Sequence, residues 1–341
     1  MSGLSIAIIA RNEEANIRAC LESAAWADEI VLVDACSEDA TVTIAREFTD
    51  RIFVRKWEGF AAQKEFSLQQ CTSPWIFSLD ADERIRPELR EAMQAVIADP
   101  HALAGYRVGR RSWFLGCWIR HGGWYPGYQL RLFRREAVRM IRRRVHEGFE
   151  VEGPIGTLTG DLDHFSHPTI AGSLDKMNRY STLEAFDRLE RKRVHAIDFI
   201  THPFAAFLRK YIAQGGFRDG VHGLVLAWVT AVVKLALYMK IRELQQRPAG
   251  ETAEAAGGEL MRLFDEYQAE LEQYQPAAGK QGRKPDLKAF VFQPAAAFWR
   301  HYVRRGRPGG VPGLMQALLA AVYATARELA NWEAGLSNTS S

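Results

Sequence analysis

Over its first hundred residues the chain alternates short apolar runs with segments of helical periodicity. Strand-like runs cover residues 6–10, 30–33, 51–54 and 75–79, and helical segments cover 14–25, 39–48, 60–71 and 87–98. Strands that alternate with helices are typical of a parallel sheet with helices on its faces. The pattern therefore predicts an α/β fold. With 341 residues, 47 % of them hydrophobic, the chain can bury the core of one large or two modest domains.

Polar residues follow three of these predicted strands. Arg11-Asn12-Glu13 follows the first strand, Asp34 ends the second, and Asp80-Ala81-Asp82 follows the fourth. In parallel α/β sheets ligands bind outside the carboxyl ends of the strands. Asp and Asn are also favoured as helix caps and turn residues, so each position alone has a purely structural explanation. All three together indicate a binding site at one rim of the sheet.

The charge of the chain is unevenly distributed along its length. The totals of 44 basic and 41 acidic residues give a net charge of +3, but residues 1–100 carry 10 basic and 18 acidic side chains. Residues 107–144 hold eleven arginines against one acid, Glu136. A basic surface of this kind favours an anionic partner, although alternate outward residues on solvated strands are the simpler explanation.

Cysteine usage and the N-terminal segment bear on the compartment. The four cysteines show no CxxC spacing, which argues against a disulfide scaffold or a zinc cluster and favours a reducing compartment. The first apolar stretch, residues 4–10, has the length of a strand and leads directly into charged residues rather than a signal-peptide pattern. We therefore expect a cytoplasmic protein.

The sharpest local motif is Asp80-Ala81-Asp82-Glu83, directly after an apolar strand. Two carboxylates one residue apart repel each other unless a cation lies beside them, and Mg²⁺ or Mn²⁺ prefers such oxygen ligands. The motif predicts Asp82 as a direct metal ligand and Asp80 as a ribose contact or water-mediated ligand. A solvated loop before a capped helix is the alternative. The chain contains neither GxGxxG after its first strand nor GxxxxGK[ST], which disfavours dinucleotide and P-loop chemistry.

Several segments, in this order and spacing, resemble the family-2 glycosyltransferases of the GT-A fold. The likeness is to the branch that includes the lipopolysaccharide core β-1,4-glucosyltransferases, and it extends over about residues 4–240. The segments that carry it are Ile8-Ile9-Ala10-Arg11-Asn12-Glu13-Glu14, Val31-Leu32-Val33-Asp34, Gln63-Lys64, Ser78-Leu79-Asp80-Ala81-Asp82-Glu83, Gly122-Gly123-Trp124-Tyr125-Pro126, Gln129-Leu130-Arg131-Leu132-Phe133 and Val145-His146-Glu147. The resemblance implies a GT-A (Rossmann-like) nucleotide-sugar-binding domain followed by C-terminal amphipathic helices.

The resemblance also implies roles on the donor side of the site. Asp34 would contact the uracil or ribose of a UDP-sugar, and Asn12 and Glu13 would line the nucleotide pocket. Lys64 would lie on the nucleotide-sugar side, and Asp80 is expected among the residues that bind the nucleotide sugar. The family often has Asp/Ser-Gly-Ser-x-Asp after its second strand, whereas here Asp34 is followed by Ala35-Cys36-Ser37-Glu38-Asp39, which leaves the nucleotide preference open.

On the acceptor side, the resemblance implies an inverting transferase in which Glu147 takes the acceptor proton, with His146 beside it. Trp124 and Tyr125 are expected to stack on sugar faces, and Arg131 to bind a phosphate bidentately. Without the resemblance, the His146-Glu147 pair would be interpreted as an ordinary surface pair, and the aromatic residues as part of the core. His164 and His167 are interpreted as structural, with metal ligation as the alternative.

The rest of the chain divides by composition. We expect a transferase domain over residues 1–195, with short strands over 105–165, then a helical membrane-interface module over 196–245 and a linker with one amphipathic helix over 246–285. Residues 286–335 look like a second copy of the helical module, because residues 199–215 match 290–306 at an offset of 91, in Phe, Pro, Ala, Arg, Tyr and Gly. The apolar run 224–233 is too short to span a bilayer securely, since a spanning helix needs about 20 apolar residues.

These observations favour a metal-assisted transferase that moves a hexose to a lipid-linked saccharide, such as the lipopolysaccharide inner core. We expect Mg²⁺ or Mn²⁺, a nucleotide sugar and an anionic membrane surface as partners, with no nucleic acid, and a location on the inner face of the cytoplasmic membrane. A metal-dependent nucleotidyltransferase and a degenerate transferase serving as a membrane scaffold are the alternatives.

Overall fold

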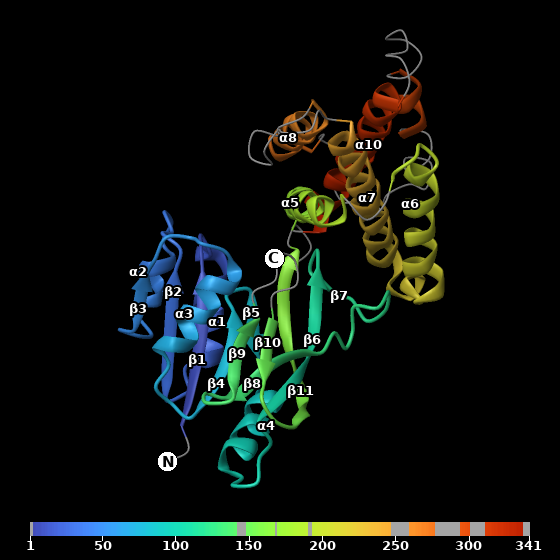
Figure 1. Cartoon of the computed structure of the whole chain (residues 1–341). Coiled ribbons are helices and arrows are strands. Elements are labelled where there is room, and N and C mark those ends of the chain that lie inside the picture. The colour runs from blue at the N-terminus through green and yellow to red at the C-terminus, as the bar shows by residue number, and fades with distance from the viewer. Residues whose placement is uncertain are drawn as a thin grey trace. The chain divides into compact units, whose positions relative to one another are not determined.

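The computed structural model describes residues 3–141, 148–167, 169–189, 193–246, 259–276, 294–300 and 311–336. The chain forms two compact units (Figure 1). The first contains Met1–Trp113 and Trp124–Ser166, and the second contains Phe114–Gly123 and His167–Ser341. Residues 167–195, expected in the first domain, belong to the second unit in the structure.

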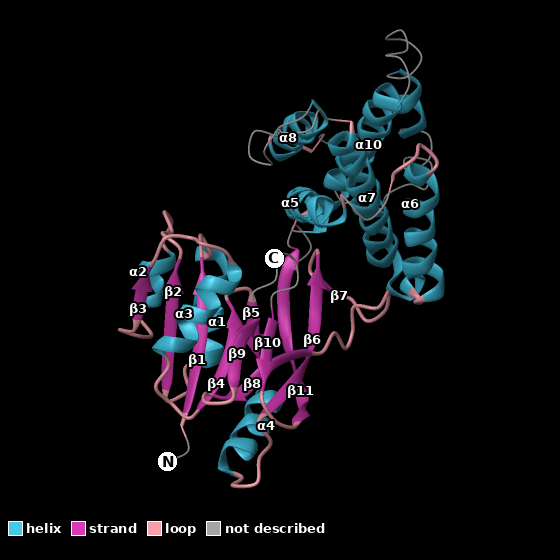
Figure 2. Cartoon of the chain, viewed as in Figure 1, coloured by secondary structure: helices cyan, strands magenta, loops and turns pink. Residues whose placement is uncertain are grey.

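The first unit is built on one mixed sheet, shown by the magenta arrows in Figure 2. Its parallel half confirms the predicted β/α alternation, with strand order β3-β2-β1-β4. The sheet continues through β8, β6, β11 and β5, and β8 runs antiparallel to both β4 and β6. The bounds are β1 (Leu4–Ala10), β2 (Glu29–Asp34), β3 (Ile52–Val54), β4 (Trp75–Asp80), β5 (Glu83–Ile85), β6 (Gly105–Phe114), β8 (Gln129–Arg134) and β11 (Ile155–His167).

Helices cover both faces of this sheet because strand side chains alternate between the faces. Ile6 and Ile8 of β1 belong to the core cluster on one face, together with residues of α1, α2 and α4. Ala7 belongs to the cluster on the other face, where Leu68 of α3 packs. The helices are α1 (Glu14–Ala24), α2 (Thr41–Ala45), α3 (Phe60–Gln70) and α4 (Pro87–Ala98).

The region predicted to hold only short strands differs from that prediction. β6 has 10 residues and β11 has 13, while β9 (Val138–Ile141) and β10 (Gly148–Val151) form a separate two-stranded sheet. The glycines of β6 and β11 mark close approaches rather than strand ends. A Cβ at Gly109 would lie 2.2 Å from Asp161 Oδ1, and one at Gly156 would lie 2.9 Å from the Tyr106 ring.

The second unit is helical. It contains α5 (Ile170–Arg188), α6 (Asp198–Leu208), the π-helical turn η1 (Arg209–Ala213), the 3₁₀ turn η2 (Gly216–Asp219), α7 (Gly220–Gln245), α8 (Glu259–Glu272) and α10 (Val311–Leu336). Within the described residues, one helical stretch, Gly216–Gln245, has the length and apolar composition to cross a membrane. In its most apolar window 67 % of the residues are buried inside the protein. α7 is therefore the core helix of this unit.

The proposed internal repeat aligns helices of similar length. α7 and α10 each have 26 residues. When Gly220 is aligned with Gly310, α7 begins at Gly220 and α10 begins one position later, at Val311. Residues 294–299 are helical and align with the second half of α6. The duplication remains a prediction.

A short piece of chain, Phe114–Gly123, leaves the first unit and belongs to the second. It contains β7 (Cys117–Trp118) and is held by the turns before α7. The buried carboxylate of Asp219 accepts hydrogen bonds from the backbone N–H groups of Arg120 and His121 and lies 2.9 Å from His121 Nδ1. Lys210 Nζ donates to the carbonyl of Gly122 at 2.6 Å. The helical unit therefore fixes the residues that directly precede Trp124.

Candidate active site

The register of the parallel strands brings the predicted rim residues together. Ile9 is paired with Asp80 and Ala10 with Asp34, so β1, β2 and β4 end at the same level. The side chains that follow these strands therefore share one edge of the sheet, where α/β proteins bind their ligands.

Asp80 lies between two basic side chains at this rim. Lys64 Nζ is 2.8 Å from Asp80 Oδ1, and Arg131 Nη2 is 2.7 Å from Asp80 Oδ2. Burial would raise the pKa of Asp80, but the charges and hydrogen bonds of Arg131 and Lys64 outweigh it and hold the pKa well below its usual range. Asp80 is thus a carboxylate whose charge the protein itself already neutralises.

Arg131 is buried and joins two carboxylates. Its Nη2 also lies 2.6 Å from Glu83 Oε1, and Glu83 is fully buried. Burial raises the pKa of Glu83 and the nearby Asp80 charge adds to this, although Arg131 opposes it. The structure gives Arg131 a different set of partners from the expected phosphate, because its guanidinium lies in the protein interior. A phosphate contact by Arg131 remains a prediction.

Asp82 lies next to a histidine of β11. His164 Nε2 is 3.4 Å from Asp82 Oδ2, and His164 Nδ1 is 3.4 Å from Ser112 Oγ. Both Asp82 and His164 are partly exposed, with 19 % and 12 % of their side-chain surfaces accessible. One carboxylate and one imidazole are ligands that Mn²⁺ or Mg²⁺ can use if substrate phosphates and waters complete its shell. Within the described part of the chain, no cluster of three or more His, Cys, Asp or Glu side chains forms a metal cage.

The loops after β1 and β2 are tied to each other. Asn12 Oδ1 accepts the backbone N–H of Glu38, and the backbone N–H of Asn12 donates to Ser37 Oγ. Asp34 is buried, and its two oxygens accept the backbone N–H and hydroxyl of Ser37. Each carboxylate oxygen has a second lone pair, so a nucleotide contact by Asp34 would have to use those that remain.

Two residues in these loops have left-handed backbone conformations. Asn12 has φ 54° and Cys36 has φ 59°. Asn tolerates this region better than most residues, whereas Cys does not. Cys36 stands where the family pattern often has glycine, and it adopts the left-handed conformation that glycine favours. Glu13 precedes α1, where its Oε2 accepts from Asn16 Nδ2 at 2.9 Å.

Two of the predicted acceptor residues, Trp124 and Tyr125, lie in the first unit, shortly before β8. Tyr125 is 37 % exposed, and its hydroxyl donates to Asp161 Oδ2 at 3.1 Å. Burial and the neighbouring Asp161 raise the pKa of this phenol. Trp124 is half-buried. A tyrosine ring held by its hydroxyl presents its face for stacking on a sugar.

Glu147 and His146 lie outside the described residues, and so does the rest of the segment 142–147. The base assigned from the resemblance is therefore a prediction that depends on the sequence motif alone. Of the other predicted residues, the structure brings Lys64, Asp80 and Arg131 into direct contact, and it links Asn12 to Asp34 through Ser37.

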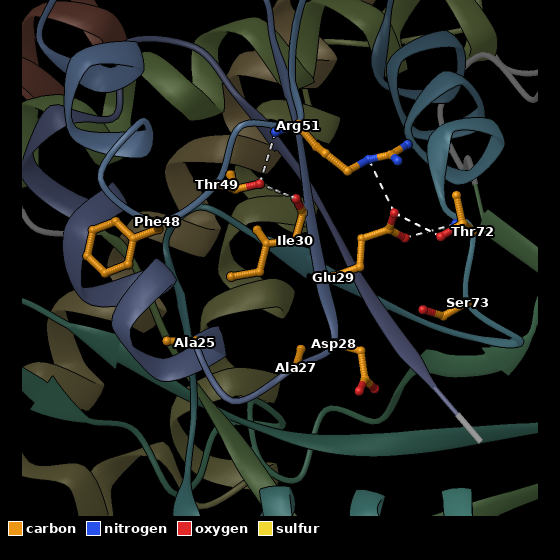
Figure 3. Close-up of a pocket in the computed structure, with 10 residues that line it drawn as sticks. All are labelled: Ala25, Ala27, Asp28, Glu29, Ile30, Phe48, Thr49, Arg51, Thr72 and Ser73. Atoms are coloured by element: carbon orange, nitrogen blue, oxygen red, sulfur yellow. Dashed lines mark hydrogen bonds and ion pairs between the residues drawn. The ribbon is translucent and has the colours of Figure 1, made fainter. Parts of the chain in front are cut away.

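A pocket of about 500 Å³ occurs at the opposite end of the parallel strands (Figure 3). It is lined by residues that precede or begin strands, including Glu29, Arg51 and Thr72. Glu29 already accepts hydrogen bonds from Ser5 and Thr72, which with Arg51 hold its pKa below the usual value despite the opposing effect of burial. This pocket is separate from the rim that carries the motif residues.

Sequence reasoning assigned no role to several polar residues near the rim. Glu83 shares Arg131 with Asp80, and its place in the Asp80-Ala81-Asp82-Glu83 motif was the available signal. Asp163 of β11 binds Trp113 Nε1 at 2.9 Å and lies 3.4 Å from both Arg86 and Arg111. Asp161 and Asp163 alternate along β11, but the partners of Asp163 come from β6 and from Arg86, directly before α4.

The first unit is a mixed α/β sheet with an acidic rim after β4, and the second unit is helical. The family model "Glycosyl transferase family 2" matches residues 5–151. The chain is 37 % identical over 256 residues to the "Lipopolysaccharide core biosynthesis glycosyltransferase LpsC" of Rhizobium meliloti, which covers 72 % of this chain and 95 % of that protein. The chain belongs to glycosyl transferase family 2.

Other relatives are more distant. An uncharacterized glycosyltransferase of Rickettsia typhi is 26 % identical over 266 residues, covering 72 % of this chain and 88 % of that protein. The crystal structure of S. aureus TarS in complex with UDP-GlcNAc matches 81 % of this chain and 95 % of that chain at 17 % identity, with a TM-score of 0.38.

Proposed function

We propose that this glycosyltransferase moves a hexose from a UDP-sugar to a lipid-linked saccharide such as the lipopolysaccharide inner core. The acceptor class follows the name of the relative that is 37 % identical over nearly all of its length. The acidic motif at the carboxyl ends of the strands, in a chain of glycosyl transferase family 2, supports a nucleotide-sugar donor.

The observation that carries the proposal is that the two aspartates of the motif have different partners. Asp80, with 28 % of its side-chain surface accessible, is neutralised by Lys64 and Arg131, whereas Asp82, with 19 % accessible, lies 3.4 Å from the imidazole of His164. This favours Asp82 over Asp80 as the carboxylate that holds a divalent cation. We infer that Asp82 and His164 hold Mg²⁺ or Mn²⁺, which offsets the charge of the diphosphate leaving group.

The chain's own residues supply the rest of the donor site. Lys64 is 18 % exposed and places an ammonium group beside the carboxylate of Asp80. We propose that this group lies near the sugar or phosphate of the donor, and that Asn12, Glu13 and Asp34 line the nucleotide end. The paired loops after β1 and β2 fix these three residues relative to one another before the donor binds.

For the acceptor, we propose an inverting reaction in which Glu147 takes the proton of the attacking hydroxyl, with His146 beside it. Trp124 and Tyr125 offer aromatic surface to the acceptor saccharide. A lipid-linked acceptor would require the protein to work at the inner face of the cytoplasmic membrane, bound peripherally.

The direct test is a thermal-shift series with UDP, UDP-glucose, UDP-GlcNAc and other nucleotide sugars, with and without Mn²⁺. A bound donor stabilises the folded protein by mass action, so one UDP-sugar with Mn²⁺ should raise the melting temperature most. Asp82→Asn should remove the Mn²⁺-dependent part of this shift and lower sugar transfer by at least ~100-fold. Glu136→Gln, outside the site, is the matched control. Normal transfer by Asp82→Asn would refute the proposal.

A further inference from the structure

The outward side of α6 carries a row of large apolar side chains. Ile197, Ile200 and Phe204 are each about 60 % exposed, and their spacing of three and four residues puts them on one side of the helix. The opposite side faces α7: Phe199 is buried, and the His202 ring stacks on Tyr238 with centroids 4.2 Å apart. Among the described elements, α6 packs chiefly against α7, as Figure 2 shows.

The turns after α6 carry two more exposed apolar side chains. Ile212 in η1 is 59 % exposed and Phe217 in η2 is 51 % exposed. Thus five of the twelve large apolar side chains that are exposed in the described chain fall between residues 197 and 217. Isolated exposed apolar residues are normal on a soluble protein, but a concentration of this kind marks an interaction surface. We call these five residues the α6 surface.

Basic side chains border the α6 surface. Arg193, Arg209 and Arg218 are exposed. The acid in this stretch, Asp198, is buried and turned inward, where it accepts the His195 N–H at 2.8 Å and lies 3.1 Å from His202 Nε2. The apolar side chains suit the acyl boundary of a bilayer, and the arginines around them suit the headgroups of acidic lipids.

The dimensions favour binding in the plane of a membrane. α6 has 11 residues, whereas a spanning helix needs about 20. α7 has the length to span, but its apolar surface is largely used inside the helical unit. The element available to a membrane is therefore the outward side of α6 rather than α7.

We propose that the α6 surface docks the protein on an anionic lipid bilayer, with Ile200 and Phe204 inserted at the level of the headgroups. This inference rests on the proposed function in one respect, since a lipid-linked acceptor makes such a surface useful. It assigns the membrane contact to named residues of one short helix and its following turns.

The test is sedimentation of the full-length protein with vesicles of phosphatidylglycerol and phosphatidylethanolamine, and with vesicles of phosphatidylcholine alone. The wild-type protein should bind the anionic vesicles more strongly, and high salt should weaken that binding. The double variant I200S/F204S should lower the partition coefficient by about tenfold or more, because two apolar side chains no longer leave water. Arg209→Gln with Arg218→Gln should reduce binding to anionic vesicles selectively.

The matched control is Val54→Ser, which removes an equally exposed apolar side chain from β3 of the other unit and should leave vesicle binding unchanged. Undiminished binding by I200S/F204S would overturn the inference. So would a change from dimer to monomer in light scattering without a change in vesicle binding, because a second copy would then be the occupant. Vesicle binding without any donor-induced thermal shift in the wild-type protein would count against the proposed function alone.

Discussion

The guanidinium of Arg131 lies 2.6 Å from the carboxylate of Glu83, and neither side chain is accessible at the site surface: Glu83 is 0 % exposed and Arg131 is 4 % exposed. The same Arg131 nitrogen binds Asp80 on the rim. Arg131 therefore joins the carboxylate of Asp80, at the rim, to the buried carboxylate of Glu83. A change at any of these three residues alters both the stability of the unit and the charge at the rim.

Arg131→Met should strongly destabilise the first unit. It leaves Glu83 buried without its counter-charge and removes one of the two cations beside Asp80, and breaking a buried ion pair from one side costs about 3–5 kcal/mol. Urea unfolding followed by tryptophan fluorescence measures the loss. Arg139→Met is the control, because Arg139 and Glu152 form an exposed pair and its loss should change the midpoint little. Equal midpoints for the two variants would contradict this account.

His164→Ala should weaken the metal dependence of donor binding. If His164 and Asp82 share a cation, removing the imidazole raises the Mn²⁺ concentration needed for half of the donor-induced thermal shift by roughly tenfold or more. The measurement is a Mn²⁺ titration at a fixed UDP-sugar concentration, with a chelator as the zero point. His101→Ala, on an exposed loop, is the control. An unchanged titration would show that His164 is structural.

Lys240 should make the helical unit more stable as pH rises above neutrality. Burial lowers its pKa to about 7, although Asp265 and Glu243 oppose the shift, and its ammonium group donates to four oxygens of α5. Between pH 7 and 10.5 the unfolded chain binds this proton and the folded chain releases it, so stability increases with pH over that range, by up to about 4–5 kcal/mol.

Lys240→Met should therefore remove that rise. Urea midpoints from pH 6.5 to 9, followed by circular dichroism, compare the slopes of the variant and the wild-type protein. Lys234→Met is the control on the same helix, because Lys234 is partly exposed and lies 3.5 Å from Glu184. Parallel slopes for the wild-type protein and Lys240→Met would rule out this assignment.

Asp219→Ala should loosen the segment 114–123. It removes the acceptor of the Arg120 and His121 backbone N–H groups, one exposed and one partly buried, and each lost hydrogen bond should cost about 0.5–1.5 kcal/mol. Hydrogen exchange of peptides covering 114–123 should speed up by roughly tenfold or more. Asp175→Ala removes an exposed helix pair with Arg179 and should leave this exchange unchanged. Unaltered exchange in Asp219→Ala would mean that other contacts hold the segment.

The parallel half of the sheet and its rim could be predicted because their signals are local. Hydrophobic periodicity located β1, β2 and β4, and the rule that ligands bind at the carboxyl ends of strands selected Asp34, Asp80 and Asp82. The register in which Ile9 faces Asp80 and Ala10 faces Asp34 agrees with that expectation. Family membership agrees with the resemblance noted from the motifs.

The parts that could not be predicted depend on partners distant in sequence. Gly109 is needed in β6 because Asp161, 52 positions later, occupies the space of its Cβ, and nothing near Gly109 indicates this. Arg131 belongs to a run of arginines in the sequence, and its buried position comes from Asp80 and Glu83, about 50 residues earlier. The helix 170–188 is amphipathic, but periodicity does not identify which unit supplies its partner.

The path of the chain between the units limits how this protein can be divided or recombined. Because residues 114–123 leave the sheet unit, join the helices and return before Trp124, the two units are connected by three chain crossings and not by one hinge. A chimera that exchanges the helical unit with that of a relative would therefore have to carry the 114–123 insert along with everything after residue 166. A chimera joined only at residue 166 would keep the 114–123 insert of one protein but take Asp219, the residue that binds this insert, from the other.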